Sequence, residues 1–143
     1  MTKYELLEKA ERISRVAHKD QKYGEHDYWT RHVCAVERKT KELFNTDLDL
    51  MIVAQLHDNL EDSDEFDSEY LVKVFGVEIT DAVIAITKEQ GESRNQYIER
   101  VKQNVLALKV KICDTICNLE ESIKIQDAKR IIRYSEQLAK LYK

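Results

Sequence analysis

The feature that most limits what this chain can fold into is its shortage of turn-forming residues. It has no proline and only three glycines in 143 residues. This scarcity argues against hairpins and β-turns and favours helices joined by short polar loops. Apolar residues make up 43% of the chain, which is enough for one compact core at this length. We therefore expect an all-α fold, a helical bundle in which residues 1–143 form a single domain.

Apolar spacing and capping residues divide the chain into predicted helices. Thr2 followed by Glu5 matches a capping box, and it begins a helix that runs to about Val16. Asp47 or Asp49 can cap a helix that continues to about residue 60. Further helices are expected over about 29–44, 68–76, 79–87, 93–104, 105–121 and 127–142. Polar loops are expected over residues 20–27, 61–67 and 88–92.

The apolar run 105–110 could also be interpreted as a strand, because short apolar runs are ambiguous. Three polar residues that follow it fall at i, i+3 and i+7, namely Lys111, Asp114 and Asn118. This spacing places them on one stripe of a helix, whereas a strand would scatter them over both faces. We therefore assign the whole segment to a helix.

Charge and cysteine usage limit the classes of partner. The net charge of -4 gives no general attraction for nucleic acid, although a local basic pocket could still bind a small anion. No apolar run approaches membrane-spanning length, and residues 1–10 are charged and amphipathic rather than a signal peptide. An odd set of cysteines lies in apolar helical stretches, and we interpret them as buried reduced thiols of a cytoplasmic protein: Cys34, Cys113 and Cys117.

Ionisable residues are concentrated where the apolar segment 48–60 ends. His57 and Asp58 are adjacent, so both can reach one divalent ion. Glu61 lies one helical turn beyond His57, and Asp62 lies one turn beyond Asp58. Burying such groups without partners is costly, so a metal site or a cleft explains them well. The alternative is a solvated helix end that runs into an acidic loop.

Asp114 is also unusual, because it lies within an apolar helical stretch and a buried carboxylate needs a partner. Lys111, three residues earlier, could pair with it. Asn118, one turn later, extends the polar stripe toward a polar core or a cleft. His32, early in the helix predicted over 29–44, has no distinguishing feature by itself.

Taken in order, these residues resemble the His…His-Asp…Asp pattern of the HD phosphohydrolases. The detail resembles the hydrolase domains of RelA/SpoT-type enzymes and the small stand-alone alarmone hydrolases. The matching segments cover nearly the whole chain: residues 17–21 resemble A-H-x-x-Q, 28–32 resemble P-Y-I-x-H, 56–63 resemble L-H-D-x-x-E-D-T, 75–76 resemble F-G, 86–88 resemble V-T-K, 111–119 resemble K-L-A-D-R-L-x-N-L, and Arg130 with Tyr134 resembles R-x-x-x-Y.

The resemblance implies an HD-type helical fold, a reaction and residue roles. One divalent metal, Mn²⁺ or a similar ion, would be held by His32, His57, Asp58 and Asp114. The attacking water would be oriented and activated by Glu61 and Asp62. The reaction would remove the 3′-pyrophosphate of the guanosine alarmone (p)ppGpp, giving GDP or GTP and pyrophosphate. Substrate contacts would come from Asn118, with Tyr134, Arg130, Arg94 and Lys111 as further candidates.

The chemistry of these residue types agrees with such a reaction. A divalent ion neutralises phosphate charge and lowers the pKa of bound water. A carboxylate beside it can accept the proton. Two histidines and two carboxylates with open positions suit Mn²⁺ or a similar ion better than a closed structural zinc site.

Tyr28 stands where the P-Y-I-x-H motif has Pro. Two other departures from the family pattern concern substrate recognition. The family has an Arg-Lys pair shortly after the opening Gln, where this chain has Tyr23 and Gly24. Lys22 is offset by one position, and Tyr23 could stack on a base instead. The Arg that follows the last Asp of the pattern is replaced by Thr115.

Several alternatives stay open. One is an HD phosphatase that acts on another nucleotide. A second is an HD domain that binds a nucleotide or a protein partner without catalysis, although the intact Glu61 and Asp62 argue against it. A third is a helical interaction module, which leaves Asp114 and the residues around His57 unexplained. A homo-oligomer is compatible with the sequence, and an alarmone hydrolase could lower alarmone levels or act as an antitoxin.

Overall fold

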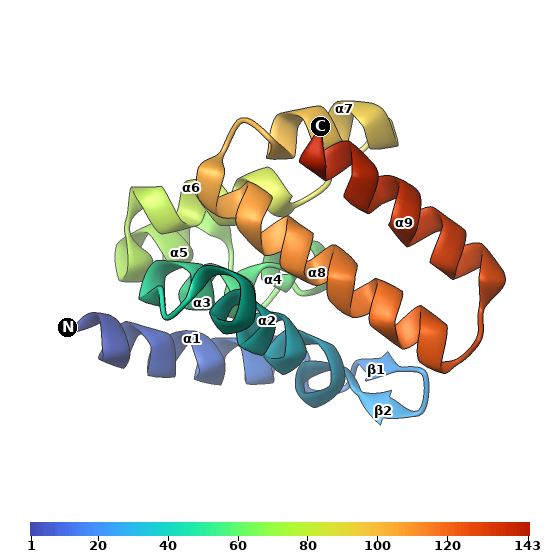
Figure 1. Cartoon of the computed structure of the whole chain (residues 1–143). Coiled ribbons are helices and arrows are strands. Elements are labelled where there is room, and N and C mark those ends of the chain that lie inside the picture. Colours follow the sequence, from blue (N-terminus) through green and yellow to red (C-terminus); the bar gives the residue numbers. More distant parts are fainter.

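The computed structural model describes all 143 residues and forms a bundle of helices with one short hairpin (Figure 1). The expected all-α class is confirmed. In chain order the elements are α1 (Lys3–Ala17), β1 (Lys22–Tyr23), β2 (His26–Asp27), η1 (Trp29–Val33), α2 (Cys34–Phe44), α3 (Leu48–Leu56), α4 (Asn59–Asp62), α5 (Ser68–Phe75), α6 (Val77–Ile86), α7 (Arg94–Val101), α8 (Val105–Lys124) and α9 (Ala128–Tyr142).

Helix α3 forms the centre of the core. Every residue from Leu50 to Leu56 is buried, as expected for a helix that is apolar on all sides and surrounded by others. Its neighbours are α1, α2, α6 and α8, of which α1 lies beneath it and α8 runs across the bundle (Figure 1). The segment that leaves α3 at His57 is therefore fixed by packing on several sides.

The ends of the helices follow the capping chemistry predicted from the sequence. Thr2 and Ser93 each complete a capping box, with Glu5 and Gln96 respectively. Asp47, one of the two predicted caps, accepts a hydrogen bond from the Leu50 amide at the start of α3. Asn104 and Asp127 cap α8 and α9 in the same way. The run 105–110 is helical, as predicted.

The expectation that the chain lacks hairpins is wrong at residues 22–27. Strands β1 and β2 pair antiparallel, with Tyr23 opposite His26, and leave a two-residue turn between them. Gly24 opens this turn with a φ of 63°. Glycine at the first position is the requirement of a type II′ hairpin turn, so a single glycine at the right place was sufficient. The hairpin packs beside η1, at the lower right of Figure 1.

The acidic stretch 61–67 was expected to be a loop, and this is only partly correct. Helix α3 ends at Leu56, with His57 as its cap, and Asp58 leaves helical geometry at φ -105° and ψ 1°. A single further turn, α4, then carries Glu61 and Asp62. The carboxylates are therefore not on a continuation of α3, and the bend at Asp58 turns them to a new direction.

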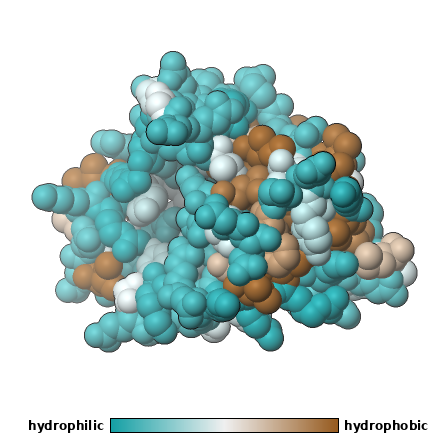
Figure 2. Space-filling view, turned by 180° about the vertical axis from the view of Figure 1, so that it is seen from behind, coloured by the Kyte–Doolittle hydropathy of each residue, from teal (hydrophilic) through white to brown (hydrophobic).

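Most of the surface is hydrophilic in the view from behind, and hydrophobic residues gather toward one side (Figure 2). Helices α5 and α6 carry exposed apolar side chains, including Val72, Val77 and Ile84. The longest helix, α8, is interrupted by charged residues, and no helix has the length and apolar character needed to cross a membrane.

The three cysteines are unpaired. Cys113 and Cys117 are buried in α8, and burial raises the pKa of both thiols to about 12. Cys34 is half-buried at the start of α2, and burial raises its thiol pKa as well. The predicted burial is therefore found for Cys113 and Cys117, and only in part for Cys34.

Candidate metal centre

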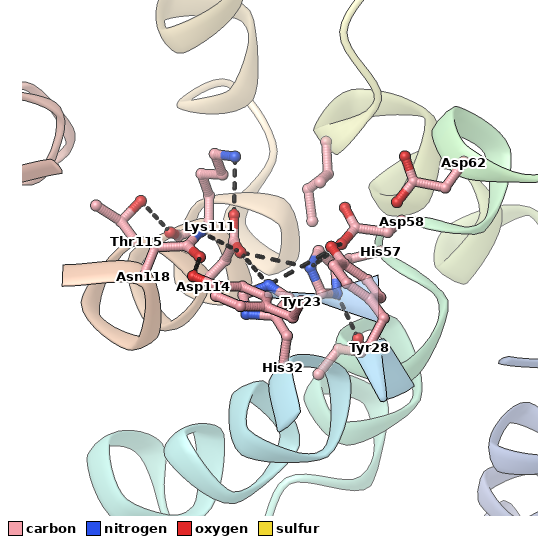
Figure 3. A network of polar contacts seen from close by, with 12 residues as sticks. Tyr23, Tyr28, His32, His57, Asp58, Asp62, Lys111, Asp114, Thr115 and Asn118 are labelled. Carbon is pink, nitrogen blue, oxygen red and sulfur yellow. Dashed lines mark hydrogen bonds and ion pairs between the residues drawn. The ribbon is translucent and has the colours of Figure 1, made fainter. Parts of the chain in front are cut away.

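Three separate parts of the chain bring the predicted metal ligands together (Figure 3). His32 comes from η1, a π-helical turn that begins the second long helix. His57 and Asp58 come from the bend between α3 and α4, and Asp114 comes from the middle of α8. π-Helical turns are rare and occur often at functional sites. We call these four residues the metal cluster.

The donor atoms of the metal cluster are spaced like those of a coordination sphere. A divalent ion about 2.0–2.6 Å from each ligand separates neighbouring ligand atoms by roughly 2.8–3.7 Å. The Nε2 atom of His32 lies 2.8 Å from Oδ1 of Asp114, and Nε2 of His57 lies 3.0 Å from Oδ2 of Asp58. The remaining His–Asp separations are 3.5 and 4.0 Å. The donor atoms of His32, His57 and Asp58 all lie within 4.8 Å of one another.

His57 is held in the tautomer that a metal needs. Its Nδ1 lies 2.6 Å from the carbonyl oxygen of Ala54, and a carbonyl can only accept, so Nδ1 carries a proton and donates it. The other ring nitrogen, Nε2, is buried and makes no hydrogen bond. A neutral imidazole fixed through Nδ1 presents the Nε2 lone pair to an ion. Nε2 is thus buried beside oxygens of Asp58 and Asp114, at 3.0 and 3.5 Å, without a hydrogen bond to either, and this arrangement fits a divalent metal.

Opposite charges are concentrated in the cluster. Burial alone would lower the pKa of His57, but the carboxylates of Asp58 and Asp114 outweigh burial and raise it well above 6.5. Burial would raise the pKa of Asp114, yet Lys111 and the two histidines hold it well below its usual range. Nζ of Lys111 lies 2.9 Å from Oδ2 of Asp114, the pair that the sequence suggested. In the metal-free state a proton on His57 therefore occupies the place that a cation would take.

Tyr28 adds a contact that the sequence analysis did not predict. Its phenol donates a hydrogen bond to Oδ2 of Asp58, and its ring packs between His18 and His32, at 5.1 and 5.3 Å. Burial and the carboxylates of Asp58 and Asp114 raise the phenol pKa, so the hydroxyl keeps its proton and stays a donor. Tyr28 occupies the proline position of the P-Y-I-x-H motif, and this departure was the one sign in the sequence that the residue has a role of its own.

The two predicted catalytic carboxylates are accessible to solvent and have different surroundings. Glu61 faces the cavity beside the metal cluster. Asp62 accepts a hydrogen bond from Nε2 of Gln21 at 3.1 Å, and Gln21 in turn binds Nδ1 of His18 at 2.7 Å. Partial burial and the nearby Asp58 raise the pKa of both carboxyl groups. Carboxylates with a raised pKa are better proton acceptors.

A cavity of about 200 Å³, which we call the metal cavity, opens beside the cluster. Four of the predicted substrate residues line it: Lys111, Arg94, Asn118 and Tyr134. Lys88 and Arg133 also line it and were not among the predicted site residues. Lys88 belongs to a recognised motif segment and Arg133 lies one turn from Arg130, so both had a sequence signal. Four cations thus face three carboxylates, which suits an anion bound beside a metal.

The remaining predicted substrate residues do not line the metal cavity. Lys22 is exposed on β1. The hydroxyl of Tyr23 donates to Oδ1 of Asn118 at 2.7 Å and accepts a hydrogen bond from Nη2 of Arg130. Arg130 therefore binds Tyr23 from α9 instead of facing the cluster.

Thr115, the second departure, is buried between α8 and α9. Its hydroxyl donates to the Lys111 carbonyl oxygen and accepts a hydrogen bond from Nε2 of Gln137, both at 2.7 Å. Oε1 of Gln137 accepts a hydrogen bond from Arg94, also at 2.7 Å. The residue that replaces the family arginine thus ties α9 to α8 and positions Arg94.

Comparisons with known proteins support the fold. No family model matches the sequence, and no curated protein matches it. Among solved structures, the chain is similar to one reported as "A metazoan ortholog of SpoT hydrolyzes ppGpp and plays a role in starvation responses", with 21% sequence identity and a TM-score of 0.77. The match covers 95% of this chain and 83% of that one. The similarity confirms the helical fold that the sequence resemblance implied.

Proposed function

We propose that this chain is a metal-dependent hydrolase that removes the 3′-pyrophosphate of guanosine alarmones. Water would attack the pyrophosphoryl group of ppGpp, and the bond between phosphorus and the 3′ oxygen would break. The water oxygen would remain on pyrophosphate, and the 3′ oxygen would take up a proton to give GDP. The similarity to a solved ppGpp hydrolase supports this choice of substrate.

The observation that carries the proposal is the spacing of the metal cluster. Each of two imidazole nitrogens, from η1 and the α3–α4 bend, lies 2.8–4.0 Å from a carboxylate oxygen of Asp58 and from one of Asp114. Nε2 of His57 is buried among them with no hydrogen bond to satisfy it. A cluster of this kind without a cation would be costly to assemble, since buried polar groups are normally satisfied.

Each nearby residue has a role in this reaction. His32, His57, Asp58 and Asp114 would hold the ion, which when bound neutralises phosphate charge and lowers the pKa of water. Glu61 faces the metal cavity, where its carboxylate can accept the proton that the attacking water loses. Nε2 of Gln21 donates a hydrogen bond to Oδ2 of Asp62, a carboxylate that lies near Asp58 but does not line the metal cavity.

The cations of the metal cavity supply the second requirement, a place for the phosphate oxygens. The side chains of Lys88 and Arg133 line the cavity, and neither forms an ion pair with a carboxylate of the chain. Arg94 is oriented by its bond to Gln137, so its guanidinium is positioned before a substrate arrives. Positive side chains fixed around a transferring phosphoryl group stabilise its charge in the transition state.

A second candidate is an HD phosphatase that acts on a different nucleotide. The observation in its favour is that the Tyr23 hydroxyl makes hydrogen bonds to Asn118 and Arg130, two residues expected to contact the alarmone. This candidate keeps the metal cluster and the water-activating carboxylates, and it changes the substrate alone.

The test is hydrolysis of ppGpp by the purified protein with Mn²⁺, beside pppGpp, GTP and other phosphorylated nucleotides, with products separated by chromatography. The proposal predicts conversion of ppGpp to GDP and pyrophosphate that stops when EDTA is added. Metal-dependent turnover of a different nucleotide alone would favour the second candidate. Absence of turnover across the panel, with metal bound, would rule out both.

A further inference from the structure

Two cavities lie on either side of Tyr23. The metal cavity, of about 200 Å³, is lined by Asn118 and by three of the four metal cluster residues, His32, Asp58 and Asp114. A larger cavity of about 840 Å³, which we call the outer groove, is lined by residues of the hairpin, η1, α2 and the end of α8. Tyr23 lines the outer groove, whereas its hydrogen-bond partner Asn118 lines the metal cavity. His32 is the one residue that lines both.

The side chain of Tyr23 is fixed between the two cavities by contacts with four residues. Its hydroxyl bonds Asn118 and Arg130, and the Arg130 guanidinium also lies 5.4 Å from the ring centroid. The ring stacks on His32 at 5.5 Å and on Tyr28 at 6.0 Å (Figure 3). Both polar atoms of the Asn118 side chain are thus in use, because its Nδ2 also donates to Oδ1 of Asp114, at 3.2 Å.

The two cavities differ in the size of ligand that each can hold. Pockets that enclose a drug-sized ligand have volumes of about 300–1,000 Å³. The metal cavity, at about 200 Å³, is below that range, and the outer groove, at about 840 Å³, is within it. A nucleotide that places its phosphates beside the metal cluster therefore has room for its base and ribose in the outer groove, across Tyr23.

We propose that Tyr23 is a specificity-determining residue that separates the phosphate end of the site from the nucleoside end. A nucleoside that reaches Asn118 must displace the phenol from both Asn118 and Arg130. Small phosphate groups enter the metal cavity without moving it. This inference rests on the proposed function, since it assumes that the ligand is a nucleotide.

The experiment measures the binding of the two reaction products, neither of which is hydrolysed further by the proposed reaction. The dissociation constants of GDP and inorganic pyrophosphate are measured by calorimetry on Mn²⁺-loaded wild type, Tyr23→Phe and Tyr23→Ala. Tyr23→Phe loses the two phenol hydrogen bonds that must otherwise be broken, which should tighten GDP binding about threefold. Tyr23→Ala also loses the ring contacts with His32 and Tyr28, and the combined loss should tighten GDP binding about tenfold. Pyrophosphate binding should change less than about twofold, because no bond to Tyr23 must be broken.

Controls separate this proposal from a folding defect and from failure of the proposed function. Tyr4→Ala removes an exposed tyrosine on α1 and should change neither constant. Tyr23→Phe keeps the ring and supplies the answer if Tyr23→Ala fails to fold. Weaker GDP binding in the Tyr23 variants would mean that the ring stacks on the base, and that result, or unchanged or absent GDP binding, overturns the proposal. A wild type that fails to hydrolyse ppGpp refutes the proposed function, while the GDP constants still decide the role of Tyr23.

Discussion

The metal cluster and the rim that faces a substrate are built in different ways. The cluster residues lie in the interior, where His57 is 0% exposed, His32 3% and Asp114 4%. The rim consists of the hairpin, with strands of two residues each, and the amphipathic helix α9, of which only Gln137 and Leu141 are buried. Two departures from the family pattern, Tyr23 and Thr115, contact α9, whereas a third, Tyr28, contacts Asp58 of the cluster.

This difference shows which part of such a site is free to vary. A change in the metal cluster would leave a buried charge or a buried ring nitrogen without a partner, which is expensive. A new side chain on the half-buried rim can find a partner nearby, as the hydroxyl of Tyr23 does in Arg130. We therefore expect substitutions in the cluster to affect metal binding and substitutions in the rim to affect the substrate.

The largest expected effect is the loss of metal on substitution of a cluster carboxylate. Asp58→Asn keeps the shape of the side chain and removes its charge, so we expect the affinity for Mn²⁺ to fall by more than about 100-fold and activity to disappear with it. Calorimetric titration with Mn²⁺ measures the affinity. The exposed Asp81→Asn serves as the control, and Arg133→Ala in the rim should keep its metal. Full Mn²⁺ binding by Asp58→Asn would contradict the distinction between a cluster that binds metal and a rim that binds substrate.

Glu61→Gln should separate catalysis from metal binding. The carboxylate faces the metal cavity but makes no hydrogen bond to the cluster, so we expect metal affinity to be kept. Removal of a proton acceptor should slow kcat by about 10²-fold or more. Steady-state rates and Mn²⁺ titration give both values, with the exposed Glu69→Gln as the matched control. If Glu61→Gln lost its metal, Glu61 would belong to the cluster and not to the water-activating pair.

Tyr28→Phe tests whether the cluster extends to the residue that replaces the family proline. The substitution removes one hydrogen bond to Asp58 and keeps the packed ring. Groups that orient a metal ligand are commonly worth 10–100-fold in affinity, and we expect about tenfold weaker Mn²⁺ binding here. Tyr142→Phe, at an exposed tyrosine of α9, is the control. An unchanged Mn²⁺ affinity would mean that Tyr28 does not contribute to the metal site beyond the four ligands.

The smallest expected effect is a pH dependence of stability in the metal-free protein. The pKa of His57 is raised in the folded state, so its contribution is complete below about pH 6.5 and is lost as the pH rises through the folded value. In EDTA the free energy of unfolding should fall by up to about 1.4 kcal/mol per pH unit in that window. Thermal unfolding measures it. With Mn²⁺ in place of EDTA the fall should vanish, because the ion replaces the proton. A flat profile in EDTA would mean that His57 carries no stabilising proton.

Much of the fold and of the cluster could be predicted because they depend on local chemistry. Capping boxes at Thr2 and Ser93 and the polar stripe of α8 fixed helix boundaries from side-chain types alone. The cluster could be predicted because a buried carboxylate such as Asp114 needs a partner wherever it lies. The metal roles of its residues stay predictions.

The rest depends on contacts between distant segments. The bend at Asp58 arises from packing around α3, which the apolar run through residue 60 did not reveal. Tyr23 and Arg130 are 107 residues apart, so nothing local showed that they bind one another. The low glycine content of the whole chain does not exclude a hairpin, because a two-residue turn needs only one glycine, and Gly24 supplies it.

The most direct test of the metal cluster is anomalous X-ray diffraction from crystals grown with Mn²⁺. We predict one ion about 2.0–2.6 Å from Nε2 of His32, Nε2 of His57 and one carboxylate oxygen each of Asp58 and Asp114. An ion bound elsewhere, or no ion at a concentration that supports turnover, would contradict the account.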